Sequence, residues 1–272
     1  MPSRWHRPVD GEVWIMGVLN CTPDSFSDGG SFVDVQAAVN HGLSMWQDGA
    51  RLIDVGGEST RPGAASVSVE DELGRVIPVV RELTRRGCAV SIDTMKAEVM
   101  AQAIAAGAVM VNDVSALTHD PESLAVVAGS GVDVCLMHMQ GNPETMQHRP
   151  QYDDVIEDVA TFFAERIDVA LAAGIQATSI LLDPGIGFGK RLEDNLALIR
   201  SLAEFKSRFC MPVLLGVSRK SFLGLLTGCA VDDREIETAV AGAAGIIHGA
   251  DVLRVHDVKL QQRAIKVASA LS

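Results

Sequence analysis

Short apolar runs, several of them rich in Val and Ile, recur at a regular interval along the chain, and this recurrence constrains the fold more than any other feature. Each run ends at a polar or otherwise special residue, and these residues follow one another at a mean step of about 33 positions, close to one strand–helix–strand repeat. Runs that are apolar throughout are typical of parallel strands covered on both faces. The eight expected strands are Val13–Leu19, Leu52–Val55, Ala89–Ile92, Val109–Val111, Val132–Met137, Ile180–Leu182, Pro212–Leu215 and Asp251–Leu253.

Segments with apolar residues at helical spacing lie between these runs. Ser68 to Asp71 is typical of a capping box and opens the second helix, whereas Pro78 inside that segment predicts a kink or a break. The expected helices are Val35–Trp46, Val69–Arg86, Ala97–Ala106, Asp154–Ala173, Leu192–Phe205, Glu235–Gly249 and Val258–Leu271, with a less regular pattern over Pro121–Ala128.

Eight such units in roughly 250 residues predict a (β/α)₈ TIM barrel, with its active site at the C-terminal ends of the parallel strands. No low-complexity or linker-like stretch divides the sequence, so residues 1–272 are expected to form a single domain. An open doubly wound sheet is the alternative, but such a sheet usually has fewer strands and a visible switch point.

The loops that leave the strands are polar, whereas the loops that enter them are ordinary and often carry the Gly that ends a helix. In a parallel barrel the exit loops all converge on one mouth, so their polar residues are expected to lie together. One polar strand end could be a cap or a turn, but eight in register are hard to explain by structure alone. The exit loops begin at Asn20, Gly56, Asp93, Asn112, His138, Asp183, Gly216 and Arg254.

Charge and composition exclude several classes of protein. The net charge is −12, and an acidic chain without basic runs is not expected to bind nucleic acid, because phosphate neutralisation needs clustered Lys and Arg. No stretch is apolar over 18 residues, and the first 14 residues have no apolar signal region, so neither a membrane span nor a secretory signal is expected. The five scattered cysteines form no CxxC motif and predict buried, reduced thiols in a cytoplasmic protein.

The exit loops carry several cationic residues although the chain as a whole is negatively charged. This local positive charge predicts an anionic ligand such as phosphate or diphosphate. These cations are Arg61, Lys190, Arg219, Lys220, Arg254 and His256. Carboxylate and amide side chains share the rim, which suits a heterocycle rich in hydrogen-bonding groups or an oxygen-coordinated divalent ion; they are Asp24, Asp93, Asn112 and Asp183. The Gly-rich run at 185–190 has neither the dinucleotide spacing nor that of a P-loop, so by itself it indicates only a turn.

Six motifs, in this order, resemble dihydropteroate synthases over about Met16 to Val267. They are the runs Asn20–Gly30, Asp54–Ala64, Met137–Gly141, Asp183–Lys190, Ser218–Ser221 and Arg254–Asp257. Cys21 departs from the pattern, since the family more often has an aliphatic residue there. The resemblance implies a (β/α)₈ barrel, commonly a homodimer, that joins 6-hydroxymethyl-7,8-dihydropterin diphosphate to 4-aminobenzoate. The products are 7,8-dihydropteroate and diphosphate, in a step of folate synthesis that sulfonamides inhibit.

The resemblance also implies roles for individual residues. Asp24, Lys220, Arg254 and His256 are expected to serve catalysis, and Asn20 is expected to ligate Mg²⁺, the family's metal. The pterin and its diphosphate would be held by Asp93, Asn112, Asp183, Lys220, Arg254, Val255 and His256. Thr60, Arg61 and Pro62 would close over the aminobenzoate together with Phe26, Phe188 and Ser221.

Two other functions remain open at the level of the sequence. Pterin-binding methyltransferases that work with a corrinoid share the barrel and the Asp/Asn pattern, but they need no diphosphate site and no aminobenzoate loop. A non-catalytic pterin-binding homologue would be expected to lack one of the two long loops, and both are present here.

Overall fold

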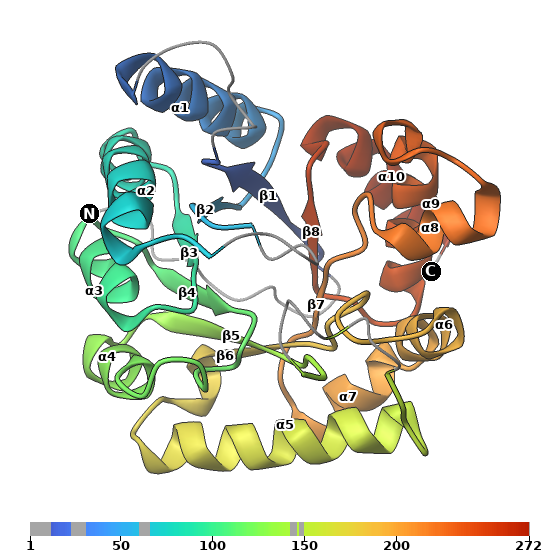
Figure 1. The fold of residues 1–272 in the computed structure, drawn as a ribbon. Helices are drawn as coiled ribbons and strands as arrows, with labels where there is room; N and C mark the ends of the chain where they lie inside the picture. Colours follow the sequence, from blue (N-terminus) through green and yellow to red (C-terminus); the bar gives the residue numbers. More distant parts are fainter. Residues whose placement is uncertain (1–11, 23–30, 60–65, 142–145, 147–149, 272) are drawn as a thin grey trace.

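The strands of the protein form one parallel sheet in the middle of the molecule, and the helices surround it (Figure 1). The structure is a computed structural model that describes residues 12–22, 31–59, 66–141, 146 and 150–271. The strands are β1 Trp14–Asn20, β2 Leu52–Gly56, β3 Val90–Asp93, β4 Met110–Asp113, β5 Asp133–Met137, β6 Ile180–Asp183, β7 Leu214–Leu215 and β8 Val252–Val255. Their order is β6-β5-β4-β3-β2-β1-β8-β7, and a parallel bridge between Leu182 and Val213 joins the two ends of the sheet. The expectation of a TIM barrel is therefore confirmed.

The helices follow the strands in alternation. They are α1 Ser31–Gln47, α2 Val69–Arg85, α3 Ala97–Ala105, α4 Ser123–Ser130, α5 Val155–Ala172, α6 Leu192–Arg200, α7 Leu202–Phe209, α8 Ser221–Thr227, α9 Glu235–Ile247 and α10 Val258–Leu271, with short 3₁₀ turns at Ala177–Ser179 and Val231–Asp233. In Figure 1, α1 and α5 lie on opposite sides of the sheet, and α8, α9 and α10 are grouped beyond β8.

The helices differ from expectation at three places. Pro78 does not break α2, which continues to Arg85, because Pro78 and Gly74 are both on the exposed face and water can bond the freed Gly74 carbonyl. The segment expected as one helix over Leu192–Phe205 is two helices that meet at Ser201. α8 was not expected, because its seven residues are too few to show a helical period.

Two hydrophobic clusters divide the core. The larger one packs the outward faces of the strands against the helices. The smaller one takes one residue from each strand, or for β3 the residue just before it, and fills the inside of the barrel with Met16, Leu52, Ala89, Met110, Cys135, Leu181, Leu214 and Val252. Because side chains alternate along a strand, the residues two positions further on also face inward, but nearer the C-terminal mouth. Asp54, Asn112, Asp183 and Arg254 stand at such positions, so the strand period brings four polar side chains together above an apolar plug.

All five cysteines are free, in agreement with the expectation of reduced thiols. Cys21, Cys88 and Cys135 are buried, and burial raises the pKa of the Cys21 thiol to about 12. Cys210 is exposed and Cys229 is half-buried, so the expectation that every thiol is buried was wrong.

Candidate active site

Arg254 on β8 is the centre of the polar cluster in the barrel mouth. Its Nε donates to Asp54 Oδ2 at 2.7 Å and its Nη2 donates to Asp93 Oδ2 at 2.6 Å. The guanidinium thus bridges β8 to β2 and β3 while 22 % of its side chain stays exposed. Burial by itself would lower the pKa of Arg254, but Asp54 and Asp93 together raise it, so the group stays charged.

Asn112 and Asp93 stand beside this bridge. Asn112 Nδ2 donates to Asp54 Oδ2 at 2.9 Å, so a single carboxylate oxygen receives both the amide and the guanidinium. Burial raises the pKa of the Asp93 carboxyl to about 7, although Arg254 counteracts the shift.

Asp183 ends β6, and its side chain is held by the turn at Gly185, which follows Pro184. Its Oδ1 accepts from the Gly185 N–H at 2.7 Å. Gly185 has φ +68°, and a Cβ there would meet the His138 carbonyl oxygen, so the turn requires glycine. Asp183 Oδ2 lies 4.0 Å from where a Cβ on Gly216 would stand, and the glycine leaves that space at the mouth open. Burial raises the pKa of the Asp183 carboxyl, and Lys220 opposes the rise.

Lys220 precedes α8 and reaches back into the mouth. Its Nζ donates to the Ile186 carbonyl and lies 4.2 Å from the centre of the Phe188 ring, a cation–π distance. Burial lowers the pKa of the Lys220 ammonium to about 8, against the opposing effect of Asp183. The backbone around Lys220 is fixed from α9, because Arg219 N–H donates to Thr238 Oγ1 at 3.1 Å and Arg234 donates to the Arg219 carbonyl at 3.1 Å.

His256 follows β8 and pairs with Ser218. Its Nδ1 lies 2.9 Å from Ser218 Oγ, and the same hydroxyl accepts from the His256 backbone N–H at 3.3 Å. A hydroxyl that accepts from the backbone can donate to Nδ1, and in that tautomer the ring proton is on Nε2.

The other expected site residues lie at the rim of the mouth, in the outer core, or outside the residues that the structure describes. Asn20 ends β1 beside Gly56 and is half-buried, Phe188 is half-buried under Lys220, and Ser221 is exposed at the first turn of α8. Val255 is only 1 % exposed and packs in the outer core, so it can reach a ligand at the mouth only through its backbone. Asp24, Phe26, Thr60, Arg61 and Pro62 lie outside the described residues.

Two of the expected mouth cations have other partners. Arg219 is bound to Glu235 at 2.6 Å on the surface. Lys190 is buried, and its Nζ lies 2.9 Å from His138 Nδ1, 3.2 Å from the His138 carbonyl oxygen and 3.1 Å from that of Phe188. Burial lowers the pKa of Lys190 to about 7 and that of His138 to about 3, so the neutral imidazole accepts from the lysine. Lys190 therefore ties the Gly-rich turn to the end of β5 and does not offer a free charge for phosphate.

Asp54 is the inward-facing residue that sequence reasoning did not assign to the site. It was included in an expected strand and in the motif Asp54–Ala64 without a role of its own, although it stands two positions after Leu52, as Asn112 stands after Met110 and Arg254 after Val252. That shared period of two was the signal that could have found it.

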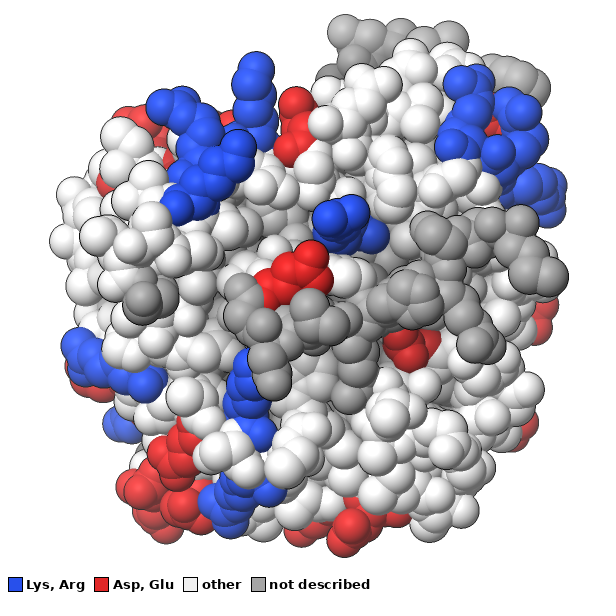
Figure 2. Space-filling view, turned by 180° about the vertical axis from the view of Figure 1, so that it is seen from behind, with Lys and Arg blue, Asp and Glu red and all other residues white. Residues whose placement is uncertain are grey.

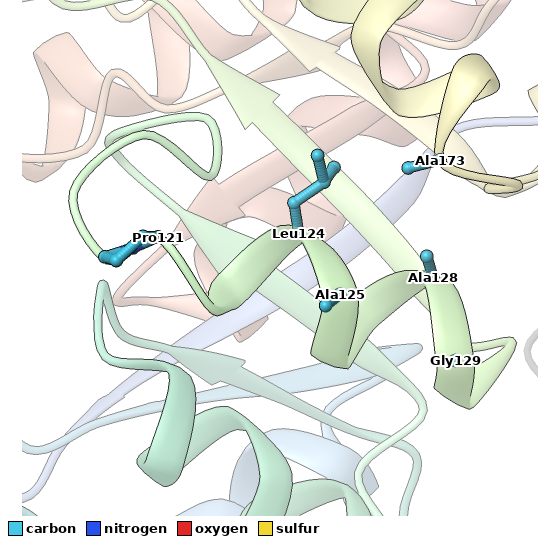
Figure 3. A pocket seen from close by; sticks show the side chains of 6 residues that line it. All are labelled: Pro121, Leu124, Ala125, Ala128, Gly129 and Ala173. Atoms are coloured by element: carbon cyan, nitrogen blue, oxygen red, sulfur yellow. The ribbon is translucent and has the colours of Figure 1, made fainter.

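A hollow outside the barrel is lined by Pro121, Leu124, Ala125, Ala128, Gly129 and Ala173, between α4 and the end of α5 (Figure 3). None of these side chains is ionisable, so the chemistry belongs to the mouth. On the face shown in Figure 2, Lys and Arg side chains form separate groups and not one continuous basic surface. None of the helices in the described part of the chain is long and apolar enough to cross a membrane.

The chain matches the family described as "Pterin binding enzyme" over residues 16–256. It is 48 % identical over 257 residues to the dihydropteroate synthase of Escherichia coli, covering 94 % of this chain and 90 % of that protein. A crystal structure of the Yersinia pestis dihydropteroate synthase with a sulfonamide drug superposes with a TM-score of 0.91 at 45 % identity, covering 97 % of this chain and 96 % of that one. The Xanthomonas albilineans enzyme with 4-aminobenzoic acid gives 0.89 at 46 % identity, covering 96 % and 93 %. This chain therefore belongs to the pterin binding enzymes and, within them, to the dihydropteroate synthases, which are transferases.

Proposed function

We propose that this chain condenses 6-hydroxymethyl-7,8-dihydropterin diphosphate with 4-aminobenzoate, giving 7,8-dihydropteroate and diphosphate. The observation that carries the proposal is the buried mouth cluster, in which acceptors for ring N–H groups stand beside two cations. A pterin has the donor edge of a guanidine, and a buried carboxylate accepts from two such N–H groups at once. The X. albilineans structure with 4-aminobenzoic acid and the Y. pestis structure with a sulfonamide, at TM-scores of 0.89 and 0.91, support the second substrate.

Asp183 is the proposed acceptor for the donor edge of the pterin, because it stands at an inward-facing position at the end of β6, beside the space at Gly216. Asn112 and Asp93 supply further acceptors, and Lys220 donates to the opposite side of the ring while its ammonium lies over Phe188. The partly exposed guanidinium of Arg254 faces the ring and the diphosphate together, and a planar group suits both tasks better than an ammonium would.

The reaction breaks the C–O bond at the methylene attached to the dihydropterin. Because the ring is electron-rich, diphosphate can leave ahead of attack by the aniline nitrogen, and the protein has to neutralise the leaving group and position the amine. Arg254 and the Nε2–H of His256 would stabilise the departing diphosphate. Departure of diphosphate would leave a positive charge on the pterin and its methylene carbon. Asp24 is proposed to stabilise that charge, and the loop with Thr60, Arg61 and Pro62 to hold the aminobenzoate.

Mg²⁺ is proposed as the cofactor, with Asn20 as its protein ligand. No cluster of three or more His, Cys, Asp or Glu side chains that could hold a metal is found among the described residues, but Asn20 offers an amide oxygen at the mouth. This donor set fits an ion that usually keeps several waters and binds through one or two protein oxygens together with substrate phosphates. When bound, the ion would neutralise charge on the leaving diphosphate.

A homodimer is proposed from the surface of the last quarter of the chain. Large apolar side chains on α8, the turn after it, α9 and α10 are exposed, including Leu225, Val231, Ile236, Val240 and Val267. Exposed apolar surface of this kind supports a contact with a second copy of the chain, and sedimentation would detect the dimer. We further propose that the protein works in the cytoplasm, where its five free thiols would stay reduced.

A coupled assay of diphosphate release tests the function. Release that depends on 4-aminobenzoate, together with formation of dihydropteroate, is expected. Binding of the pterin without any release would favour a non-catalytic homologue. Transfer of a methyl group from a pterin to a corrinoid would favour the methyltransferase alternative.

A further inference from the structure

Asp54 is buried so completely that no ligand in the mouth can touch it. The residue is 0 % exposed, and its Oδ1 is sealed from solvent without a hydrogen-bond partner among the described residues. Burying a carboxylate costs several kcal/mol unless its partners compensate. An apolar residue at this position would have continued the plug made by Leu52 and its neighbours inside the barrel. The barrel instead holds a carboxylate whose contacts are confined to one oxygen.

Asp54 Oδ2 receives one donor from each of two residues proposed to hold the pterin. Arg254 Nε lies 2.7 Å away and Asn112 Nδ2 lies 2.9 Å away. These partners come from β8 and β4, so one oxygen on β2 sets the direction of side chains from both sides of the barrel. Neither partner could turn without leaving the carboxylate less well paired in a site screened from water.

The hydrogen bond to Asp54 also determines which atom of the Asn112 amide can bond a ligand in the mouth. An amide has two donor hydrogens on nitrogen and an acceptor oxygen, and reversing it exchanges them. A reversed Asn112 would place its oxygen against Asp54 Oδ2, where two acceptors repel each other. The oxygen of Asn112 is therefore the atom left for another partner, and pterin ring N–H groups are donors of the matching kind.

We propose that Asp54 is a positioning residue for pterin recognition, whose Oδ2 fixes Asn112 as a hydrogen-bond acceptor and holds the Arg254 guanidinium in place. The inference rests on the proposed function, because it takes Asn112 and Arg254 as pterin-binding residues. It differs from a purely structural role, since it predicts a loss of ligand affinity that an exchange of residues can repair.

The test compares Asp54→Asn, Asn112→Asp and the double exchange Asp54→Asn with Asn112→Asp. Each is titrated calorimetrically with 6-hydroxymethyl-7,8-dihydropterin diphosphate and melted thermally. Asp54→Asn lets the Asn112 amide reverse, and Asn112→Asp sets two carboxylates against each other, so each single change is expected to weaken binding by about tenfold or more. The double exchange restores an N–H···O bond between the positions and leaves an acceptor oxygen for the ligand. It is expected to recover affinity to within about threefold of the unaltered chain.

Asp113→Asn is the matched control. Asp113 follows Asn112 on β4 and is also buried, but its oxygens accept from the backbone N–H groups of Ser115 and Leu117 and, among the described residues, from no side chain proposed to bind the pterin. It is expected to lower the melting temperature without changing pterin affinity. Steady-state kinetics add a second readout, since Asp54→Asn should raise KM for the pterin substrate and leave KM for aminobenzoate nearly constant.

Unchanged affinity in Asp54→Asn, or additive losses in the double exchange, would overturn the positioning role. If Asp54→Asn does not fold, the double exchange is judged against Asn112→Asp, and a double variant no tighter than that single variant overturns the role as well. Failure of the unaltered chain to bind the pterin diphosphate would refute the proposed function itself, which is a separate result.

Discussion

At the scale of single residues, Asp183 serves the fold and the site with different oxygens. Oδ1 caps the Gly-rich turn through the Gly185 N–H, and Oδ2 is near the open space at Gly216. In Asp183→Asn the amide oxygen can keep the turn bond, but an N–H then faces the donor edge of the pterin. The mismatch costs about 1–3 kcal/mol or more, so we expect pterin affinity to fall by about tenfold to several hundredfold with little change in melting temperature. Calorimetry beside a thermal melt checks this, and a large drop in melting temperature with normal affinity would assign Asp183 to the turn alone.

Lys220 gives the same site a dependence on pH. Because burial lowers its pKa to about 8, the ammonium is charged below that pH and neutral above it. Binding of the pterin diphosphate is therefore expected to weaken as the pH rises through about 8, well before an ordinary lysine would titrate. In Lys220→Arg the side chain stays charged, so the alkaline decline should vanish even where affinity is lower. An alkaline decline that is identical in both proteins would assign it to another group.

The positions and pairings of the mouth residues differ in how readily the sequence predicts them. The polar strand ends placed Asp93, Asn112, Asp183 and Arg254 in one mouth, because parallel strands deliver their ends to one edge. The sequence could not show that Lys190 and Arg219 are bound within the protein, since those pairings depend on side-chain directions in loops.

At the scale of elements, an ion-pair network joins the loop after β2, helix α2 and the residue that precedes α3. Lys96 Nζ donates to Glu58 at 2.6 Å and to Glu72 at 2.5 Å, and Glu58 also accepts from the Val67 N–H at 2.9 Å. Glu72 is fully buried and the other two side chains are 12–15 % exposed, so their charges are little screened. The network therefore holds together both ends of the segment between Glu58 and Val67.

Lys96→Met should destabilise the fold strongly, because it leaves two buried carboxylates facing each other without a cation. Breaking a buried pair in this way costs about 3–5 kcal/mol, measured as the free energy of unfolding in urea. Arg208→Met is the control, since the pair between Arg208 on α7 and Glu157 on α5 is about half exposed and should cost less than about 1 kcal/mol. Equal losses in the two variants would show that the network contributes no more than a surface pair.

The segment between those anchored ends carries Arg61, proposed to contact the aminobenzoate. Arg61→Ala is expected to raise KM for 4-aminobenzoate several-fold and to leave binding of the pterin diphosphate nearly unchanged. Separate titration of KM for each substrate checks the assignment. An equal loss for both substrates would mean that the loop holds the pterin, or that the change disturbs the whole mouth.

Element boundaries were predictable where pattern and packing agree. The strands follow the apolar runs closely, and Ser68 caps α2 as expected, with its Oγ accepting from the Asp71 N–H; the Asp71 carboxylate accepts from the Ser68 hydroxyl and not from the Ser68 backbone N–H, so only half of the expected capping box forms. The helix boundaries were predicted wrongly where the spacing of apolar residues does not distinguish a helix from a turn. The break at Ser201 and the short α8 depend on how the chain turns around β7, which has only two residues.

At the scale of the whole molecule, a net charge of −12 opposes the approach of a diphosphate, and only a few cations offset it at the mouth. Two of the expected mouth cations, Lys190 and Arg219, are already paired within the protein, which leaves Arg254 and Lys220 as mouth cations among the described residues, with His256 beside them as an N–H donor. Arg254 itself lies between two carboxylates, so part of its charge is compensated before any ligand arrives. The fixed charges of the described mouth therefore fall short of those of a diphosphate.

This shortfall predicts that turnover depends on a divalent ion. Excess EDTA is expected to abolish product formation, and added Mg²⁺ should restore it, whereas NaCl of equal ionic strength should not. The control ligand is 6-hydroxymethyl-7,8-dihydropterin without the diphosphate, whose affinity should not respond to EDTA because it lacks the group that the ion would neutralise. Undiminished turnover in EDTA would mean that the protein's own cations suffice, with Arg61 in the loop outside the described residues as the first candidate for the missing charge.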